Sequence, residues 1–249
     1  MRLVSANVNG IRAAARRGGV EWLAAQEADV ICLQEVRATD QQLAGALGDT
    51  FQGWHLAHRP SAVRLGHAGV TILSRKPLQV TQDLGCADDE GRWVATRIGD
   101  LEIASVYVHT GQADTPAQDD KHRFLDAMGK WMEQRSPALV CGDLNVAHQQ
   151  ADIKNWRGNV GKAGFLESER AYLTQWYDDL GWIDLGRDAG FTWWSWRGKA
   201  FDNDAGWRID CVLASPDLAA ACRAFTVGRA PTYAERWSDH APVTVELEW

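Results

Sequence analysis

Short apolar runs alternate with segments of helical spacing along the whole chain. Runs of apolar and β-branched residues between turn residues are typical of strands, and apolar positions recurring every third or fourth residue are typical of helices. The runs predict strands at Leu3–Asn7, Asp29–Glu35, Trp54–His58, Gly69–Ser74, Gln79–Gln82, Trp93–Ile98, Leu101–His109, Ala138–Cys141, Ile209–Ala214, Phe225–Gly228 and Val243–Leu247. Helical spacing predicts helices at Val20–Gln26, Gln118–Arg135 and Glu167–Leu180.

The order of these elements indicates an α/β fold. Gly99 and Asp100 join two predicted strands in a hairpin, and Pro137 follows the end of the longest helix. Hairpins mixed with helices predict layered sheets with helices outside. No Pro/Ser-rich linker or low-complexity tract interrupts the order, so we expect one domain over residues 1–249. The irregular stretches Trp156–Gly164 and Arg197–Gly206 are long and polar, and are predicted to be binding loops.

Composition narrows the class of protein. The 249 residues are 45% hydrophobic and 24% charged, which is ordinary for a globular chain. No apolar run approaches the roughly 18 residues of a membrane span, so no membrane partner is expected. Five cysteines form no C-x-x-C pair, and we expect free thiols in a reducing cytoplasm.

Net charge argues against a protein that coats nucleic acid without specificity. Such proteins are basic, whereas this chain has a formal charge of −7. Either the partner is not a polyanion, or acidic residues are concentrated in a cation site while basic residues line a local groove. The 13 tryptophans are several times the number that a chain of this length usually has. Core packing explains any single one, but a cluster of them is of interest.

Polar side chains gather where the predicted strands begin or end. Each one alone is compatible with a helix cap or a turn, but together they predict a site at one sheet edge: Asn7, Glu35, Asp143, Asn145, Asp210, Asp239 and His240. Carboxylates brought together repel one another unless a cation or a proton is shared between them. Oxygen ligands with one imidazole suit Mg²⁺ or Mn²⁺ better than zinc. The chemistry this predicts is metal-assisted hydrolysis of a phosphate ester.

The segments that hold these residues resemble a known family from about residue 2 to residue 247. They are Asn7–Ala13, Leu33–Glu35, Gly142–His148, Phe191–Trp196, Gly206–Asp210 and Ser238–His240. They closely resemble the exonuclease III family of apurinic/apyrimidinic endonucleases, within the endonuclease/exonuclease/phosphatase superfamily. The resemblance implies a four-layered α/β sandwich, in which two mixed β-sheets pack face to face with helices outside.

The resemblance also implies roles for the clustered residues. Glu35 would be the principal metal ligand, with Asn7 nearby and Asp239 assisting. Asp143 would orient or deprotonate the attacking water beside Asn145, and Tyr107 would face the leaving oxygen. His240, held by Asp210, would contact the phosphate. It could instead be the base, and the sequence leaves that choice open.

The resemblance further implies how substrate is held. Trp193, Trp207 and Ile209 match positions that form a small apolar pocket for a base-free deoxyribose. Candidates for contact with the DNA backbone are Arg37, His67, Arg92, Lys121, Arg123 and Arg197. The chain departs from the family pattern at His109–Thr110, Ala113, Lys162 and Arg197, which bears on the grip on damaged DNA and on the balance of endonuclease and exonuclease activity.

The function implied is a Mg²⁺-dependent DNA-repair phosphodiesterase, with Mn²⁺ as a substitute. It would cut the backbone of double-stranded DNA 5′ to abasic sites and trim 3′ ends, acting as a monomer in the cytoplasm, or at the nucleoid if bacterial. One alternative is a superfamily phosphatase acting on a lipid or inositol phosphate. A non-catalytic DNA-binding protein is the other, and the filled catalytic positions argue against it.

Overall fold

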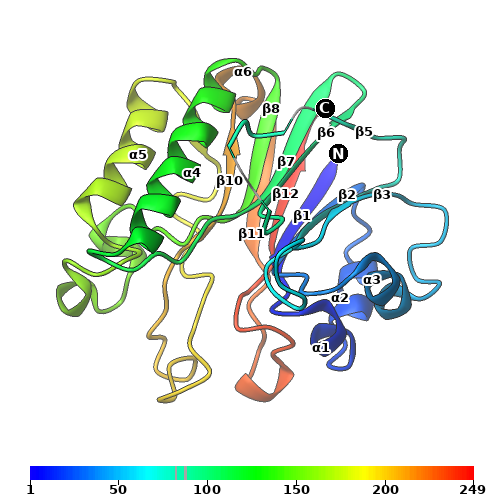
Figure 1. Ribbon diagram of the computed structural model, residues 1–249. Coiled ribbons are helices and arrows are strands. Elements are labelled where there is room, and N and C mark those ends of the chain that lie inside the picture. The colour runs from blue at the N-terminus through cyan, green and yellow to red at the C-terminus, as the bar shows by residue number, and fades with distance from the viewer. Residues whose placement is uncertain (82, 87–88) are drawn as a thin grey trace.

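Two six-stranded mixed sheets form the centre of the computed structural model, which describes residues 1–81, 83–86 and 89–249 (Figure 1). The first sheet has the order β11-β12-β1-β2-β4-β3. Its β1 and β2 run parallel, and its other neighbours are antiparallel. The strands are β1 (Arg2–Asn7), β2 (Val30–Gln34), β3 (His55–Arg59), β4 (Val70–Ser74), β11 (Cys222–Val227) and β12 (Val243–Leu247).

The second sheet has the order β5-β6-β7-β8-β10-β9, with β7 and β8 parallel and the other neighbours antiparallel. Each sheet therefore places one parallel pair near its middle. The strands are β5 (Gln79–Val80), β6 (Trp93–Ile98), β7 (Leu101–Tyr107), β8 (Ala138–Asp143), β9 (Ile183–Asp184) and β10 (Asp210–Ala214).

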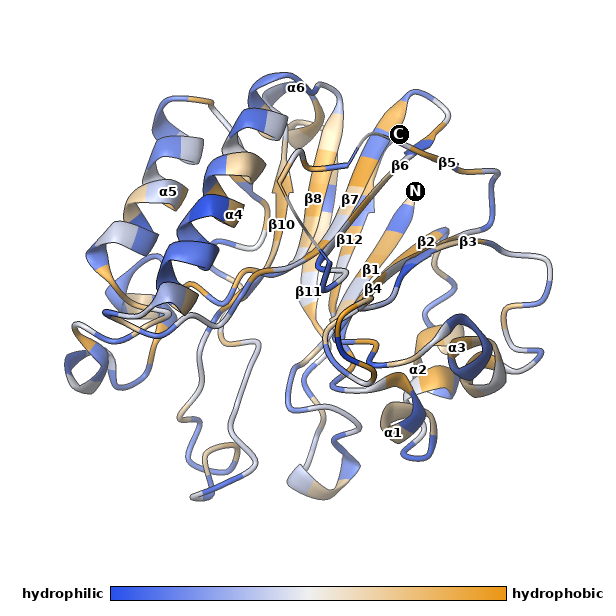
Figure 2. Ribbon diagram, in the orientation of Figure 1, coloured by the Kyte–Doolittle hydropathy of each residue, from blue (hydrophilic) through white to orange (hydrophobic). Residues whose placement is uncertain are grey.

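Helices cover the outer face of each sheet, and hydropathy follows this layering (Figure 2). The first sheet packs against α1 (Ile11–Ala15), α2 (Gly19–Ala25) and α3 (Asp40–Leu47), and the second against α4 (Pro116–Glu133) and α5 (Glu167–Asp178). The short α6 (Pro216–Ala219) follows β10. No helix in the described part of the chain combines the length and apolarity needed to cross a membrane.

The facing sheets enclose an apolar core, and polar side chains also join the two sheets across it. Leu3 and Val30 of the first sheet share a buried cluster with Ile103 and Leu139 of the second. Within it, the buried Gln34 amide donates to the Ser5 hydroxyl at 3.2 Å and to the Ser105 hydroxyl at 3.0 Å. Because these partners lie on different sheets, the bonds fix the sheets against each other next to Glu35.

The predicted fold class is confirmed, and the long elements lie where the pattern placed them. The structure adds α1, α3, α6 and β9, which the pattern did not predict. These elements, apart from α3, are short: α1 and α6 are helices of less than two turns, and β9 is a strand of two residues. Such lengths are too short to show a periodicity in the sequence. Thr39 and Gln42 form a capping box at the start of α3, a local signal that could have revealed it. The predicted strand Gln79–Gln82 ends at Val80, and Gln82 lies outside the described residues.

Strand register brings the polar strand ends to one rim. Tyr107 pairs with Asp143, which pairs with Asp210, while Asn7 pairs with Gln34 in the other sheet. The loops at residues 195–206 and 228–236 project at this rim, at the end of the sandwich opposite the two termini (Figure 1). The topology therefore delivers the polar groups of both sheets to one place.

A substitution at Gly142, in β8, tests how closely the neighbouring strands must approach to keep this register. Its φ of +147° is unfavourable for other residues, and a Cβ there would overlap the carbonyl oxygen of Val106. We expect Gly142→Ala to lower the free energy of unfolding by more than about 3 kcal/mol in urea titrations. Gly18→Ala is the control, since Gly18 has a φ of +84° but open space around its Cα. Equal losses in both variants would contradict the steric argument.

Candidate active site

A cavity of about 270 Å³ opens at the rim where the two sheets end. One end of it is acidic and the other is apolar. Most of the residues predicted to form the site line it: Glu35, Tyr107, Asp143, Asn145, Trp193, Trp207, Ile209, Asp239 and His240. Asn7 and Asp210 are buried directly behind this lining, in contact with it.

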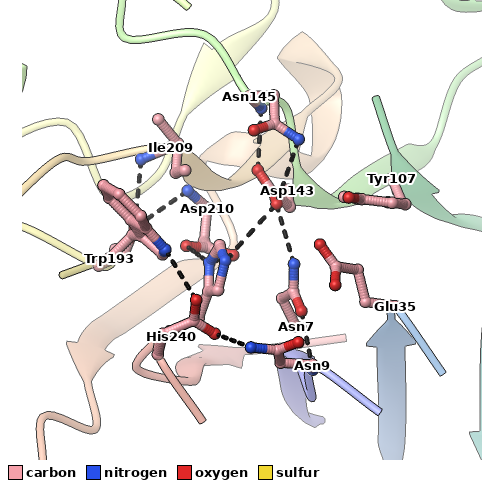
Figure 3. A network of polar contacts seen from close by, with 12 residues as sticks. Asn7, Asn9, Glu35, Tyr107, Asp143, Asn145, Trp193, Ile209, Asp210 and His240 are labelled. Carbon is pink, nitrogen blue, oxygen red and sulfur yellow. Dashed lines mark hydrogen bonds and ion pairs between the residues drawn. The ribbon is translucent and has the colours of Figure 1, made fainter. Parts of the chain in front are cut away.

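Asp143, at the end of β8, is the most constrained acid of the cavity (Figure 3). Its Oδ1 accepts the backbone N–H of Asn145 at 2.9 Å, and its Oδ2 accepts the Asn7 side-chain amide at 2.9 Å. Asn145 in turn donates its side-chain amide to the carbonyl of Val108 at 2.9 Å. These bonds join Asp143 to both sheets and fix the orientation of its carboxylate.

The surroundings of Asp143 hold its pKa near neutrality. Burial, with a 1% exposed fraction, raises the pKa of the carboxyl, and the charges of Asp210 and Glu35 raise it further. The His240 imidazolium opposes this rise, and the pKa settles at about 7. A carboxylate with such a pKa can accept a proton near physiological pH.

His240 is held by Asp210 and turned towards Asp143. Its Nδ1 lies 2.9 Å and 3.1 Å from the two oxygens of Asp210, and its Nε2 lies 3.8 Å from Asp143 Oδ2. Burial alone would lower the pKa of the imidazole. The charges of Asp210 and Asp143 outweigh burial and raise the pKa to about 10. The ring is therefore a cation at neutral pH, with its Nε2–H directed towards the cavity.

Glu35 and Tyr107 face each other on the opposite side of the acidic end (Figure 3). Glu35 forms an ion pair with the guanidinium of Arg37, and both groups line the cavity. Burial of Tyr107 and the nearby charges of Glu35 and Asp143 raise the pKa of the phenol, so it stays protonated. A protonated phenol can donate a hydrogen bond into the cavity.

The backbone is strained where the cavity lining leaves the strands. Asn9, Glu35, Arg37 and Asn145 all line the cavity and have φ between 45° and 51°. Non-glycine residues rarely adopt this conformation, and it costs of the order of 1–3 kcal/mol each. The surrounding bonds, such as Asn9 N–H to Asn7 Oδ1 at 3.0 Å, hold these turns in place.

Asp239 joins the acidic end to the apolar end. Its Oδ1 accepts the Asn9 amide at 2.7 Å, and its Oδ2 accepts the indole N–H of Trp193 at 3.2 Å. Trp193 is one wall of the apolar recess, and Trp207 stands against it with ring planes at 87° and centroids 6.2 Å apart. Ile209 completes this wall.

The acidic end has the chemistry of a site for a hard cation. Four carboxylates, those of Glu35, Asp143, Asp210 and Asp239, gather there beside the cationic groups of His240 and Arg37. Ligand atoms of Asp143, Asp210 and His240 lie within 4.8 Å of one another. Asp210 holds the imidazole through both of its oxygens. Glu35, Asp239 and the side-chain oxygen of Asn7 are the other oxygen groups that could serve as ligands at this end. An oxygen-rich set of this kind suits Mg²⁺ or Mn²⁺.

Several residues predicted to contact the DNA backbone do not line the cavity. The Arg92 guanidinium lies over the Tyr107 ring at 4.7 Å and donates to Glu90, and His67 contacts both Arg92 and Glu90. Arg197 is exposed on its loop. Arg123 is exposed on α4 beside Asp120.

The assignment of Lys121 to the DNA backbone is wrong. Its side chain is fully buried and bonded to Glu169, so it cannot reach a phosphate. The helical spacing of α4 could not show this, because the partner lies 48 residues further along the chain.

Asn9 and Thr192 hold other residues of the site in place, although neither had a role in the sequence prediction. Asn9 holds Asp239, and Thr192 uses its hydroxyl to accept the backbone N–H groups of Ile209 and Asp210 at 3.1 Å and 3.0 Å. Both lie inside the motifs that carried the resemblance, at Asn7–Ala13 and Phe191–Trp196. Their position in those motifs was the available signal.

Comparison with known proteins agrees with this geometry. The model of the endonuclease/exonuclease/phosphatase family matches residues 4–240. The chain belongs to this family. It is 33% identical to an exodeoxyribonuclease of Bacillus subtilis, over 98% of each chain.

Two solved structures of family members superpose on the chain over the full length of both molecules. An AP endonuclease from Archaeoglobus fulgidus has a TM-score of 0.89 at 25% identity. The 3′ phosphatase NExo from Neisseria, bound to a product DNA hairpin, has a TM-score of 0.87 at 28% identity. Family membership and these full-length relatives identify a hydrolase of the nuclease type.

The pairing of His240 with Asp210 predicts a measurable pKa change. In Asp210→Asn, we expect the pKa of His240 to fall by about one to three units, because a charge that favours the imidazolium is lost while burial remains. Imidazole ¹⁵N resonances, followed against pH in EDTA, report this directly. Asp40→Asn is the control, since Asp40 contacts only His58 among the histidines of the described residues. An unchanged pKa in Asp210→Asn would show that Asp210 does not hold the imidazolium.

Proposed function

We propose that the protein is a Mg²⁺-dependent DNA-repair phosphodiesterase that cuts double-stranded DNA 5′ to abasic sites and processes 3′ ends. The observation that carries the proposal is the union, in one cavity, of the acidic end and the recess between Trp193 and Trp207. Asp239 contacts both through its two oxygens. A backbone phosphate at the acidic end would place the adjoining sugar in the recess.

The recess suits a sugar that has lost its base. Trp193, Trp207 and Ile209 present apolar surface, and the backbone N–H of Ile209 is already bound by Thr192. The indole N–H of Trp193 is likewise taken, by Asp239. Gly164 lies directly against Trp207, so that even a methyl group there would come within 3.0 Å of the indole. A small apolar recess of this kind favours a flipped abasic sugar over an intact nucleotide.

Asp143 and His240 are proposed to take different parts in the reaction. With a pKa of about 7, Asp143 can accept the proton of an attacking water, and its bonds to Asn7 and Asn145 aim the carboxylate. His240 is already protonated, with a pKa of about 10, which fits a cationic clamp on a phosphate oxygen better than a base. This assignment is our choice between the alternatives that the sequence left open.

The remaining groups complete the chemistry. Glu35, with Asn7 and Asp239, would hold the Mg²⁺, which supplies Lewis-acid stabilisation of charge on the phosphate. Tyr107 remains a phenol and can donate a hydrogen bond to the leaving oxygen. Arg92, stacked on the Tyr107 ring and bonded to its carbonyl at 3.3 Å, holds that phenol in place.

The rim of the cavity carries the groups proposed to grip DNA. Arg37 lines the cavity, and Lys162 and Arg197 are exposed on loops at the rim. His67 lies beside Arg92, where a phosphate could approach from the loop that follows β3. We expect one protein molecule per lesion, because both ends of the cavity come from one chain. The apolar recess favours a deoxyribose over an inositol phosphate, because every carbon of the inositol ring carries a hydroxyl or phosphate group that would have to lose water there.

Replacing Asp143 tests the proposed base. On a labelled duplex with one abasic analogue, we expect Asp143→Asn to lower kcat at least about a hundredfold in Mg²⁺, with binding kept or improved. The exposed Asp217, changed to Asn, is the control for loss of a carboxylate. A variant with normal kcat and weak binding would show that Asp143 only shapes its loop. If the parent protein leaves the abasic duplex uncut in Mg²⁺ as it does in EDTA, the proposed function itself fails.

Replacing Glu35 tests the metal assignment without relying on turnover. We expect Glu35→Gln to bind Mn²⁺ at least about tenfold more weakly in electron paramagnetic resonance titrations, because a charged oxygen ligand becomes a neutral amide. Its cleavage activity should recover only in part at high Mn²⁺. The exposed Glu133, changed to Gln, serves as the control. Equal Mn²⁺ affinity in parent and Glu35→Gln would remove Glu35 from the ligand set.

A further inference from the structure

We propose that Lys121, buried in the second helical layer, is a positioning residue that holds three loops of the cavity in register. Lys121 lies on α4, and its side chain has no exposed surface. Its Nζ lies 2.6 Å from Glu169 Oε1, 2.9 Å from the carbonyl oxygen of Asn145 and 3.2 Å from that of Thr110. An ammonium has three donors, and here each has its own acceptor.

The three acceptors lead to three separate loops of the cavity. Thr110 follows β7 and Asn145 follows β8, and both residues line the cavity. Glu169 lies on α5, and its second oxygen accepts the backbone N–H of Leu166 at 3.0 Å. Leu166 ends the loop that contributes Ala163 and Gly164 to the cavity wall. One buried charge thus connects three of the loops that line the cavity.

The bond to Asn145 acts closest to the proposed chemistry. The Asn145 backbone is held at φ 49°, a conformation that needs support from its surroundings. Its N–H orients Asp143, while its carbonyl is fixed by Lys121. A shift of this residue would therefore move the hydrogen bond that aims the Asp143 carboxylate.

Stability alone does not explain a buried pair of this kind. Removing two charges from water costs several kcal/mol per ion, and replacing a buried pair with neutral residues is often neutral or stabilising. What neutral residues cannot supply is three donors directed at three loops from one atom. The geometry therefore indicates that Lys121 serves to fix the positions of the cavity loops rather than to stabilise the fold.

A double variant separates these two roles. Lys121→Met alone leaves the Glu169 charge buried and is expected to destabilise the fold. Lys121→Met/Glu169→Gln removes both charges, and its glutamine oxygen can still accept the Leu166 N–H. We expect the double variant to recover most of the melting temperature but to cleave an abasic duplex at least about tenfold more slowly in kcat, with KM nearly unchanged. Met128→Ala, a core change elsewhere on α4, is the control for stability.

Hydrogen exchange gives a readout that does not depend on the substrate. In the double variant, we expect at least about tenfold faster exchange at residues 108–111, 144–147 and 162–166, and no such change in Met128→Ala. Unchanged exchange at these loops would overturn the positioning role. Parental kcat in a well-folded double variant would also overturn it.

The kinetic test rests on the proposed function, whereas the exchange test does not. If the parent protein does not cleave the abasic duplex, the proposed function fails, and the exchange data still decide for or against Lys121.

Discussion

Burial of negative charge at the end of two packed sheets is the constraint on which the site depends. Asp143 and Asp210 are almost inaccessible to solvent, and Glu35 is little more exposed. Carboxylates in such a place repel one another, so each needs a fixed donor or a cation. Amide groups bind Asp143, an imidazolium binds Asp210, and a guanidinium binds Glu35. Burial, together with this repulsion, raises the pKa of Asp143. The repulsion also makes the acidic end attractive to a divalent cation.

The two sheets meet this constraint together. The Asn7 amide comes from the first sheet and reaches Asp143 of the second, while Ser238 donates to the Asn7 carbonyl at 2.7 Å. Gln34 bridges the sheets one residue before Glu35. Any sliding of one sheet over the other would break these bonds at once. The apolar core between the sheets thus supplies the rigidity that a preorganised charged site requires.

The sequence showed the strands and most of the acidic site because both leave local signals. Apolar runs marked the strands, and polar residues at their ends marked Glu35 and Asp143. Contacts between distant segments leave no such local signal. An example is the hydrogen bond between Asn7 and Asp143, which are 136 residues apart. For the same reason Lys121 was wrongly placed on the surface: a lysine on an amphipathic helix is usually solvated, and nothing near it in sequence indicates Glu169. Short elements such as α1 were missed because fewer than two turns show no period.

A chain with a negative net charge can still bind a polyanion if its acidic and basic residues lie in different places. Glu35, Asp143 and Asp210 are buried in the cavity and bonded to fixed donors or cations, whereas many of the basic residues lie outside it. Arg12, Arg16 and Arg17, near the first strand, are exposed, as are Arg157, Lys162, Arg197 and Lys199 on the loops of the second half. A duplex laid across the rim would meet these exposed cations before it met the buried carboxylates. Net charge describes the whole chain, whereas a nucleic acid senses charges within about one Debye length, near 8 Å at physiological salt.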